Sequence, residues 1–280
     1  MTSPPRVIGR RVRAGAVVAL LWALAFTTLY PFIFVLMTSV RTDADYTASP
    51  TGILQSFTWS NISYAWNESG LRDDVVNSVI IVVVAVVLLS IVAAMAGFAL
   101  AHLKVPLGKS LLGVSVACMI IPPSVLMIPI FQVVQDLSLL NQRLGLILVY
   151  VSLNLPFSVY LMTTYMRAVP KQLFEAARVD GAGALRSLVF VAIPLARPAL
   201  ATLATLNFLT LWNELLFSLI LLQDGKQHTL TVGIASAQGR FLTSVPSVAG
   251  GLIFSIIPPL LVFVFFQRDL VRGLTAGAVK

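Results

Sequence analysis

Six long apolar runs, separated by shorter polar segments, constrain the fold of this chain more than any other feature of its sequence. Each run has more than 20 residues, and about 20 are enough for a helix to cross the hydrocarbon core of a bilayer. With 58% hydrophobic and 11% charged residues, the composition does not fit a soluble domain. We expect an all-α membrane protein whose six transmembrane helices lie at about residues 15–40, 75–101, 111–134, 144–166, 199–222 and 246–267.

The basic residues indicate how these spans are oriented. The net charge of +8 is spread over the short polar segments and forms no single stripe, so it does not predict a nucleic-acid partner. Fourteen Lys and Arg residues fall on one side, in residues 1–14, 102–110, 167–198 and 268–280, against five on the other side. The positive-inside rule therefore places the N- and C-termini in the cytoplasm. We expect a cytoplasmic segment at 1–14 and a single transmembrane domain at 15–280.

The polar segment at residues 167–198 holds more structure than a simple connection needs. Lys171 to Asp180 contains no helix breaker, and Pro170 suits the first turn of a helix because its missing N–H costs nothing there. Gly181 can take the left-handed conformation that ends a helix. Pro194 is expected to kink the entry into the next span.

Two interpretations of this short helix are open from the residues alone. It lies on the lipid headgroups as an amphipathic surface helix, or it docks against another protein. In the second case Leu173 and Phe174 offer apolar contacts, and Glu175 and Asp180 offer charges for a partner.

Several fixed offsets in this segment carry a family resemblance. The runs Glu175-Ala176-Ala177, Asp180-Gly181-Ala182 and Ile193-Pro194-Leu195 resemble the EAA loop in the membrane subunits of bacterial ATP-binding-cassette (ABC) importers. In that family a glycine follows the glutamate by six positions and a proline follows it by nineteen, as Gly181 and Pro194 do here. Ala184 stands where the family commonly has a proline. The run Trp212-Asn213-Glu214 and residues 266–280 resemble the carbohydrate-importing branch of the same family.

The resemblance implies a type I ABC importer permease fold, in which residues 167–198 form a coupling loop that docks into a cytoplasmic ATPase. The coupling residues implied by it are Glu175, Ala176, Ala177, Asp180, Gly181 and Pro194. The implied partners are a second related permease, two copies of the ATPase, an extracytoplasmic solute-binding lipoprotein and membrane lipid. The implied location is the bacterial plasma (inner) membrane, and the implied solute is a di- or oligosaccharide.

No nucleotide, metal or other cofactor site is expected in this chain. Gly108-Lys109-Ser110 looks like the end of a phosphate-binding loop, but Leu103 stands where that loop needs a glycine. The ATP and Mg²⁺ of the importer would therefore be used by the partner ATPase. His228 has no partner at a metal-ligand spacing, and the single cysteine, Cys118, lies in an apolar run where packing is its expected role.

Polar residues within or beside the spans are candidates for a solute pathway. A carboxylate such as Glu214 is expensive in a span and usually faces a cavity or a partner. A polar contact between helices is the competing interpretation for Glu214. Pro122, Pro123 and Pro129 in the third run would break a helix that lines a translocation route, or only kink it. The candidate pathway residues are Trp212, Asn213, Glu214, Gln132 and Asn154.

Other functions fit the sequence less well. The alternative is the same machinery for a glycerol-phosphate conjugate or another small polar solute. A phosphate group should recruit arginine within the spans, and no span interior here contains one, although a partner subunit could supply it. A membrane enzyme would need clustered His, Asp, Glu or Cys at one depth, but Glu214 stands alone. A proton-coupled secondary transporter usually needs more than one ionisable group within the membrane.

Overall fold

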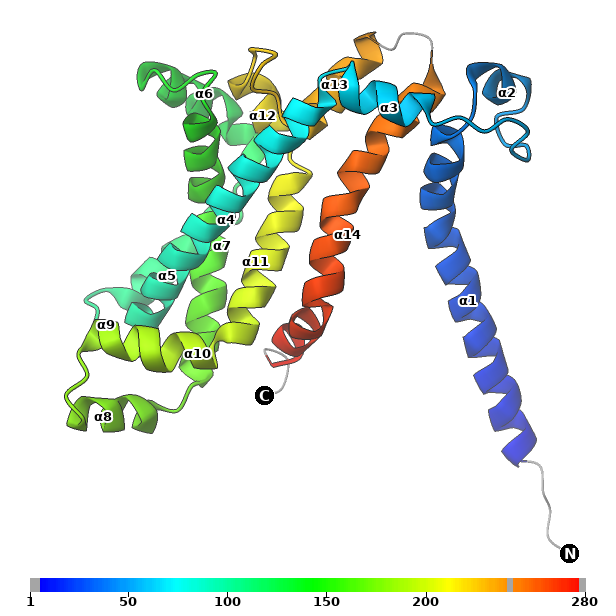
Figure 1. The fold of residues 1–280 in the computed structure, drawn as a ribbon. Coiled ribbons are helices and arrows are strands. Elements are labelled where there is room, and N and C mark those ends of the chain that lie inside the picture. The colour runs from blue at the N-terminus through cyan, green and yellow to red at the C-terminus, as the bar shows by residue number, and fades with distance from the viewer. Residues whose placement is uncertain (1–5, 241–243, 277–280) are drawn as a thin grey trace, which may run out of the picture. The chain divides into compact units, whose positions relative to one another are not determined.

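The computed structural model describes the backbone of residues 6–240 and 244–276, and the side chains of residues 15–236 and 244–270. Within these ranges the chain is helical and contains no β-strand (Figure 1), which confirms the all-α prediction. The chain divides into two compact units. One unit consists of Met1–Ser69 and Ala237–Phe254, and the other of Gly70–Ser236 and Ser255–Lys280.

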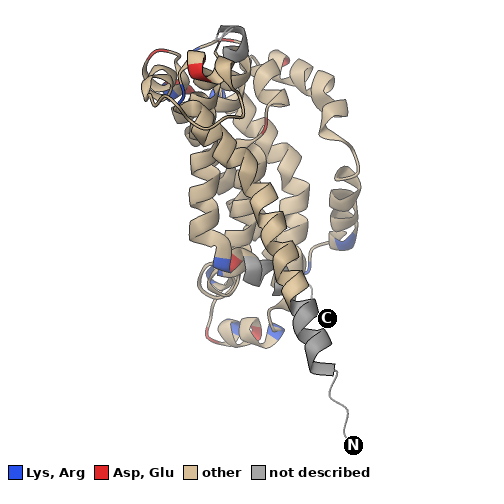
Figure 2. Cartoon of the chain, turned by 90° about the vertical axis from the view of Figure 1, so that its right-hand side faces the viewer, with Lys and Arg blue, Asp and Glu red and all other residues tan. Residues whose placement is uncertain are grey.

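Four helical stretches in the described part of the chain are long and apolar enough to cross a membrane. They are Gly15–Ser39 within α1 (Arg6–Ser39), α4 (Leu71–His102), α7 (Arg143–Ala168) and Val245–Leu270 within α14 (Val245–Ala276). Two bent helix pairs raise this number to six if each pair forms one span. Charged residues lie mainly near the helix ends and in the connections (Figure 2), as expected for helices that pass through lipid.

The predicted third span, residues 111–134, is not one straight helix. α5 (Gly108–Cys118) is followed by the 3₁₀ turn η1 (Pro123–Leu126) and by α6 (Met127–Asp136), and the two halves meet at 91°. Pro122 takes an extended conformation with ψ 129° between them. Two consecutive prolines remove two backbone donors and clash with the preceding turn, so the proline pair accounts for the break.

The predicted fifth span, residues 199–222, is also interrupted. α11 (Arg197–Trp212) ends at Trp212, and α12 (Leu216–Leu221) begins after a short gap. On the other side of α11 lie α9 (Ala184–Ser187), the π-helical turn η2 (Leu188–Ala192) and α10 (Ile193–Leu195). These three pieces together meet α11 at 78°, so the chain turns sharply as it enters the span.

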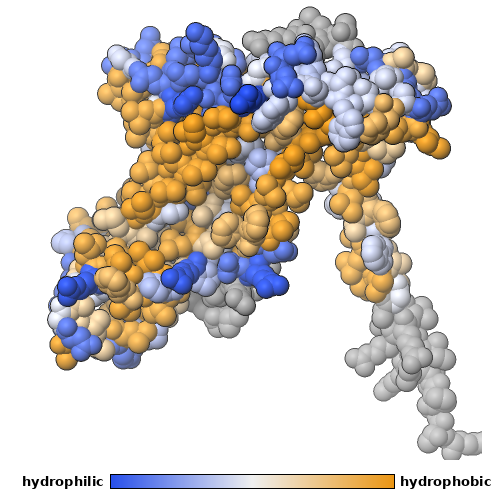
Figure 3. Space-filling view, in the orientation of Figure 1, coloured by the Kyte–Doolittle hydropathy of each residue, from blue (hydrophilic) through white to orange (hydrophobic). Residues whose placement is uncertain are grey.

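The core of the larger unit forms where α4 packs along α7 and α11. A Cβ atom placed on Gly97 of α4 would lie 2.8 Å from the Cβ of Met162 on α7, so the two backbones approach more closely than any side chain would allow. A buried cluster lies around the C-terminal end of α4 and comprises Ala93, Phe98, Met162, Met166, Phe174, Leu188, Ala192, Ala196, Ala199 and Leu203. Figure 3 shows hydrophobic residues covering the middle of this helical body and hydrophilic residues at its ends.

The opposite end of α4 holds the connection that leads into α13 (Leu230–Arg240). The Asn77 amide donates to the carbonyl oxygens of Lys226 at 3.2 Å and His228 at 3.0 Å. The Leu230 N–H donates to the Ser78 hydroxyl at 2.7 Å. These bonds fix the polar connection on α4.

In the smaller unit, a buried arginine organises the loop that follows α1. The Arg41 guanidinium donates to the carbonyl oxygens of Ser49, Pro50 and Gly52, and its Nε lies 3.5 Å from a carboxylate oxygen of Asp45. The connection between α1 and α4 contains two short helices, α2 (Asp43–Ala48) and α3 (Ser60–Asn67).

Candidate functional site

The short helix predicted after Pro170 is present as α8 (Lys171–Val179). Pro170 lies just before its first helical residue, with φ −59° and ψ 130°, and not within the first turn. Gly181 has φ +81°, so the left-handed ending is confirmed. The Gly181 N–H donates to the Arg178 carbonyl at 3.0 Å and the Ala182 N–H donates to the Ala177 carbonyl at 2.8 Å. This pair of bonds is the Schellman motif, which satisfies the last carbonyls of a helix.

α8 has one buried side chain and an otherwise open surface. Phe174 is 5% exposed and packs against Phe98 and His102 of α4, with ring centroids 5.6 and 4.1 Å away. The prediction that Phe174 is offered to a partner is therefore wrong, because the side chain points into the body of the chain. The exposed side of α8 includes Leu173, Glu175, Ala176, Val179 and Asp180.

This surface combines a charge with small and apolar groups. Val179 is 88% exposed, and a Cβ built on Gly181 would have no atom within 4 Å. The requirement for glycine at this position therefore comes from its backbone angle and not from crowding. An exposed helix with Ala176 at its surface lets another protein approach closely, whereas Ala177 is half-buried.

The segment between α8 and α11 turns within a few residues of Pro194. The Ile193 N–H donates to the Leu188 carbonyl, five residues back. Proline provides no N–H, and its ring displaces the carbonyl four residues earlier; a π turn just before it accommodates the change. The 78° bend follows between α10 and α11, in agreement with the predicted kink.

A second polar site surrounds Glu214 at the break between α11 and α12. Its carboxylate accepts hydrogen bonds from the Tyr150 hydroxyl at 2.8 Å, the Phe217 N–H at 2.8 Å and the Ser218 N–H at 3.1 Å. The Thr231 hydroxyl donates to its backbone carbonyl at 2.9 Å. Glu214 thus caps the start of α12 and ties it to α7, which is the geometry of a polar contact between helices.

The other candidate pathway residues occupy different surroundings. Trp212 is 3% exposed and its indole N–H donates to the Ser255 carbonyl at 3.0 Å. Asn213 is exposed, and its amide donates to the Leu209 carbonyl at 2.8 Å. The Asn154 amide donates to the backbone carbonyl of Tyr150 at 2.9 Å. The side chain of the same tyrosine contacts Glu214. Gln132 is exposed on α6.

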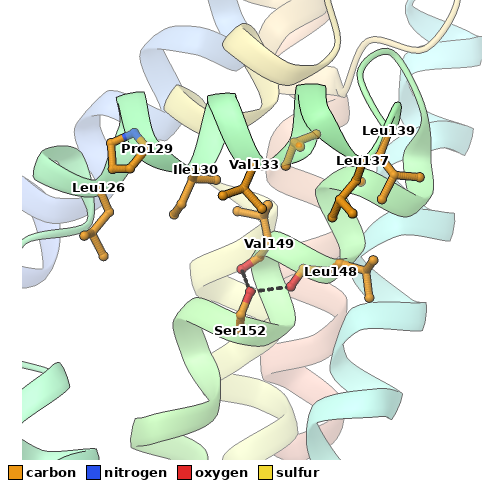
Figure 4. A pocket seen from close by; sticks show the side chains of 11 residues that line it. Leu126, Pro129, Ile130, Val133, Leu137, Leu139, Leu148, Val149 and Ser152 are labelled. Atoms are coloured by element: carbon orange, nitrogen blue, oxygen red, sulfur yellow. Dashed lines mark hydrogen bonds between the residues drawn. The ribbon is translucent and has the colours of Figure 1, made fainter.

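A pocket of about 350 Å³ lies between α6 and α7 (Figure 4). Its walls are apolar apart from Ser152, whose hydroxyl donates to the carbonyls of Leu148 and Val149 on its own helix. Without polar groups that point inward, this pocket does not match a sugar, which needs hydrogen-bond partners.

Two residues that take part in these sites, Tyr150 and His102, were not identified from the sequence. Tyr150 is 1% exposed, and the only sequence signal for it is that a buried tyrosine hydroxyl needs a partner. His102 was placed in a polar turn, yet it ends α4 and contacts Phe174. In the part of the chain that the structure describes, no group of three or more His, Cys, Asp or Glu side chains could hold a metal ion.

The chain is similar to known proteins in sequence and in fold. Residues 93–275 match the family described as "Binding-protein-dependent transport system inner membrane component". The chain is 31% identical over 275 residues to the melibiose/raffinose/stachyose import permease protein of Bacillus subtilis, which covers 96% of this chain and 98% of that protein. It is 31% identical over 263 residues to the diacetylchitobiose uptake system permease protein of Streptomyces coelicolor, covering 93% of this chain and 86% of that one.

The fold is also similar to a solved structure. A chain from the crystal structure of a bacterial ABC transporter involved in the import of the acidic polysaccharide alginate superposes with a TM-score of 0.81. The match covers 96% of this chain and 99% of the other at 26% identity.

Proposed function

Because the chain belongs to the family of inner membrane components of binding-protein-dependent transport systems, we propose that it forms part of the translocation pore of an ATP-driven importer for a di- or oligosaccharide. The relatives named above, which match it over nearly its whole length, support this proposal. The observation that carries it is α8, an exposed helix with a glycine-dependent end at the position of the family's coupling loop.

In this proposal α8 docks into a groove of a cytoplasmic ATPase through its exposed side. Glu175 supplies a charge, Ala176 allows close approach and Val179 supplies an apolar contact. Ala177, Asp180 and Gly181 shape the end of the helix, and Pro194 directs the chain into α11. ATP binding brings the docked helices together, and the stiff spans convert this movement into opening of the outer side.

The importer needs components that this chain does not supply. The proposed complex contains a second related permease, two copies of the ATPase and an extracytoplasmic solute-binding lipoprotein, assembled in the lipid of the bacterial plasma membrane. ATP and Mg²⁺ are used by the ATPase subunits, and this chain contributes no nucleotide site.

The candidate solute-contacting residues differ in how many hydrogen bonds they already make within the chain. Asn213 is exposed and bonds only within its own helix among the described contacts, so its amide is the better placed candidate. Glu214 has three donors on its carboxylate, which favours a role in holding the pathway open or closed. Gln132 and Asn154 are also proposed as solute contacts.

Uptake by the reconstituted complex tests this function. The chain would be assembled with its sister permease and ATPase in lipid vesicles, with the binding protein outside, ATP inside and radiolabelled oligosaccharides as solutes. We expect uptake of at least one oligosaccharide that requires both ATP and the binding protein. Uptake without ATP, or uptake of only non-carbohydrate solutes from a mixed panel, would contradict the proposal.

A further inference from the structure

α8 buries one side chain against the rest of the chain. Of its nine residues, only Phe174 is buried. Its ring lies against that of His102, with centroids 4.1 Å apart and planes tilted by 39°. The Phe98 ring, one turn earlier on α4, lies 5.6 Å from both of these rings. This group of three rings is the contact through which α8 meets the end of α4.

His102 is held at the other edge of its ring by α7. Its Nε2 lies 2.7 Å from the carbonyl oxygen of Met166. A carbonyl oxygen only accepts hydrogen bonds, so Nε2 carries the hydrogen and donates. Met166 lies in the last turn of α7, and its carbonyl oxygen also accepts a hydrogen bond from the Val169 N–H at 3.2 Å. The bond from Nε2 fixes the plane of the imidazole that Phe174 contacts.

The two helices joined by His102 also pack closely just above it. Gly97 lies one turn before His102, and a Cβ there would come within 2.8 Å of the Met162 Cβ and 2.9 Å of the Met162 carbonyl carbon. A displacement of one helix here must be followed by the other, because no loosely packed side chains lie between them.

From these contacts we propose that His102 and Phe174 are positioning residues that transmit the movement of α8 to the paired ends of α4 and α7. Phe174 pushes on the imidazole, which carries α4 with it, and the Nε2–H bond carries α7. This inference rests on the proposed function, because it assigns a mechanical route to the coupling that the importer requires.

The test measures solute uptake per ATP hydrolysed in the complete reconstituted complex. Phe174→Leu keeps an apolar side chain in the site and removes the ring. His102→Gln keeps a hydrogen-bond donor and removes the ring, whereas His102→Phe keeps a ring and removes the donor. Phe265→Ala is the matched control, since Phe265 is 75% exposed on α14 and takes no part in the contact.

We expect Phe174→Leu and His102→Gln to retain the co-purifying ATPase and its hydrolysis, and to lose at least about fivefold in uptake per ATP, the lower end of ordinary coupling between sites. His102→Phe should lose less uptake per ATP than His102→Gln, because the ring contact with Phe174 is kept. Phe265→Ala should match the unchanged chain.

Two results would overturn the inference. One is an unchanged uptake per ATP in both Phe174→Leu and His102→Gln. The other is a fall in the amount of assembled complex that fully accounts for the lost uptake, because the contact would then serve only stability. Failure of the proposed function itself is seen separately, as an absence of ATP-driven uptake with the unchanged chain.

Discussion

A helix ends at each of the two ends of the larger unit, α8 at one and α11 at the other, and the two endings are built differently. α8 ends through backbone geometry, with Gly181 at φ +81° and two carbonyls satisfied within the next residues. The break at Glu214 depends on a carboxylate that reaches Tyr150, 64 positions earlier in the sequence. The backbone ending of α8 uses only neighbouring residues, so the exposed surface of this helix stays available to a partner. The Glu214 carboxylate joins residues that are distant in sequence, and it thereby fixes α12 to α7.

This difference predicts which changes disturb coupling and which disturb the pathway. Changes at the exposed side or at the end of α8 should reduce ATPase docking and leave the remaining helices in place. Changes around Glu214 should affect the stability of the chain or its handling of solute, and leave the ATPase bound. The variants below test this separation in order of expected effect.

The largest effect is expected from Gly181→Val. A side chain in the left-handed conformation costs about 1–2 kcal/mol, and a β-branched residue resists it further. The end of α8 should be lost or redirected, and co-purification of the ATPase should fall by about tenfold or more. Gly183→Val is the matched control, because Gly183 has φ −69° and open space around it. Equal losses in both variants would contradict the role assigned to the backbone of Gly181.

Glu175→Lys should have a smaller effect. The carboxylate is exposed on α8, so reversal of its charge disturbs a solvent-screened contact with the ATPase, and exposed pairs are worth about 0.2–1 kcal/mol. We expect a two- to fivefold loss of substrate-stimulated ATP hydrolysis, roughly the range that this energy allows. The loss should grow at low ionic strength. Unchanged hydrolysis at both high and low salt would show that Glu175 does not face the ATPase.

The third comparison sets Glu214→Gln against Asn213→Ala. An amide at position 214 accepts fewer of the three hydrogen bonds, so thermal stability should fall by about 1–2 kcal/mol, the usual worth of a helix cap. The KM for uptake should stay nearly unchanged. Asn213→Ala should show the reverse, with a raised KM and unchanged stability. A raised KM in Glu214→Gln without loss of stability would return Glu214 to the solute pathway as a direct contact.

No signal at all is expected in a test of nucleotide binding by the chain alone. Leu103 occupies the position where a phosphate-binding loop needs its first glycine, and we therefore expect no saturable binding of ATP to the purified chain. Equilibrium dialysis with labelled ATP measures this directly. Saturable binding in the absence of the ATPase would contradict the assignment of all ATP chemistry to the partner.

The sequence predicted the features that depend on neighbouring residues. The apolar runs predicted a helical membrane protein, and the end of α8 follows from a glycine whose special conformation is a local property. The direction of Phe174 was predicted wrongly, because it depends on where α4 lies, and no local pattern encodes that. The Glu214–Tyr150 bond likewise joins two distant spans. The prolines near residue 122 predicted a helix that is broken or only kinked, and the structure shows two halves that meet at 91°.

The central claim is that α8 transmits ATP hydrolysis to transport, and stimulated hydrolysis in the reconstituted complex tests it most directly. With the unchanged chain, sugar-loaded binding protein should raise the ATPase rate above the rate with unloaded binding protein. Gly181→Val should abolish this stimulation while the spans still insert and the binding protein still binds sugar. Full stimulation in Gly181→Val would contradict the account, and would leave α8 as a helix that only lies on the membrane surface.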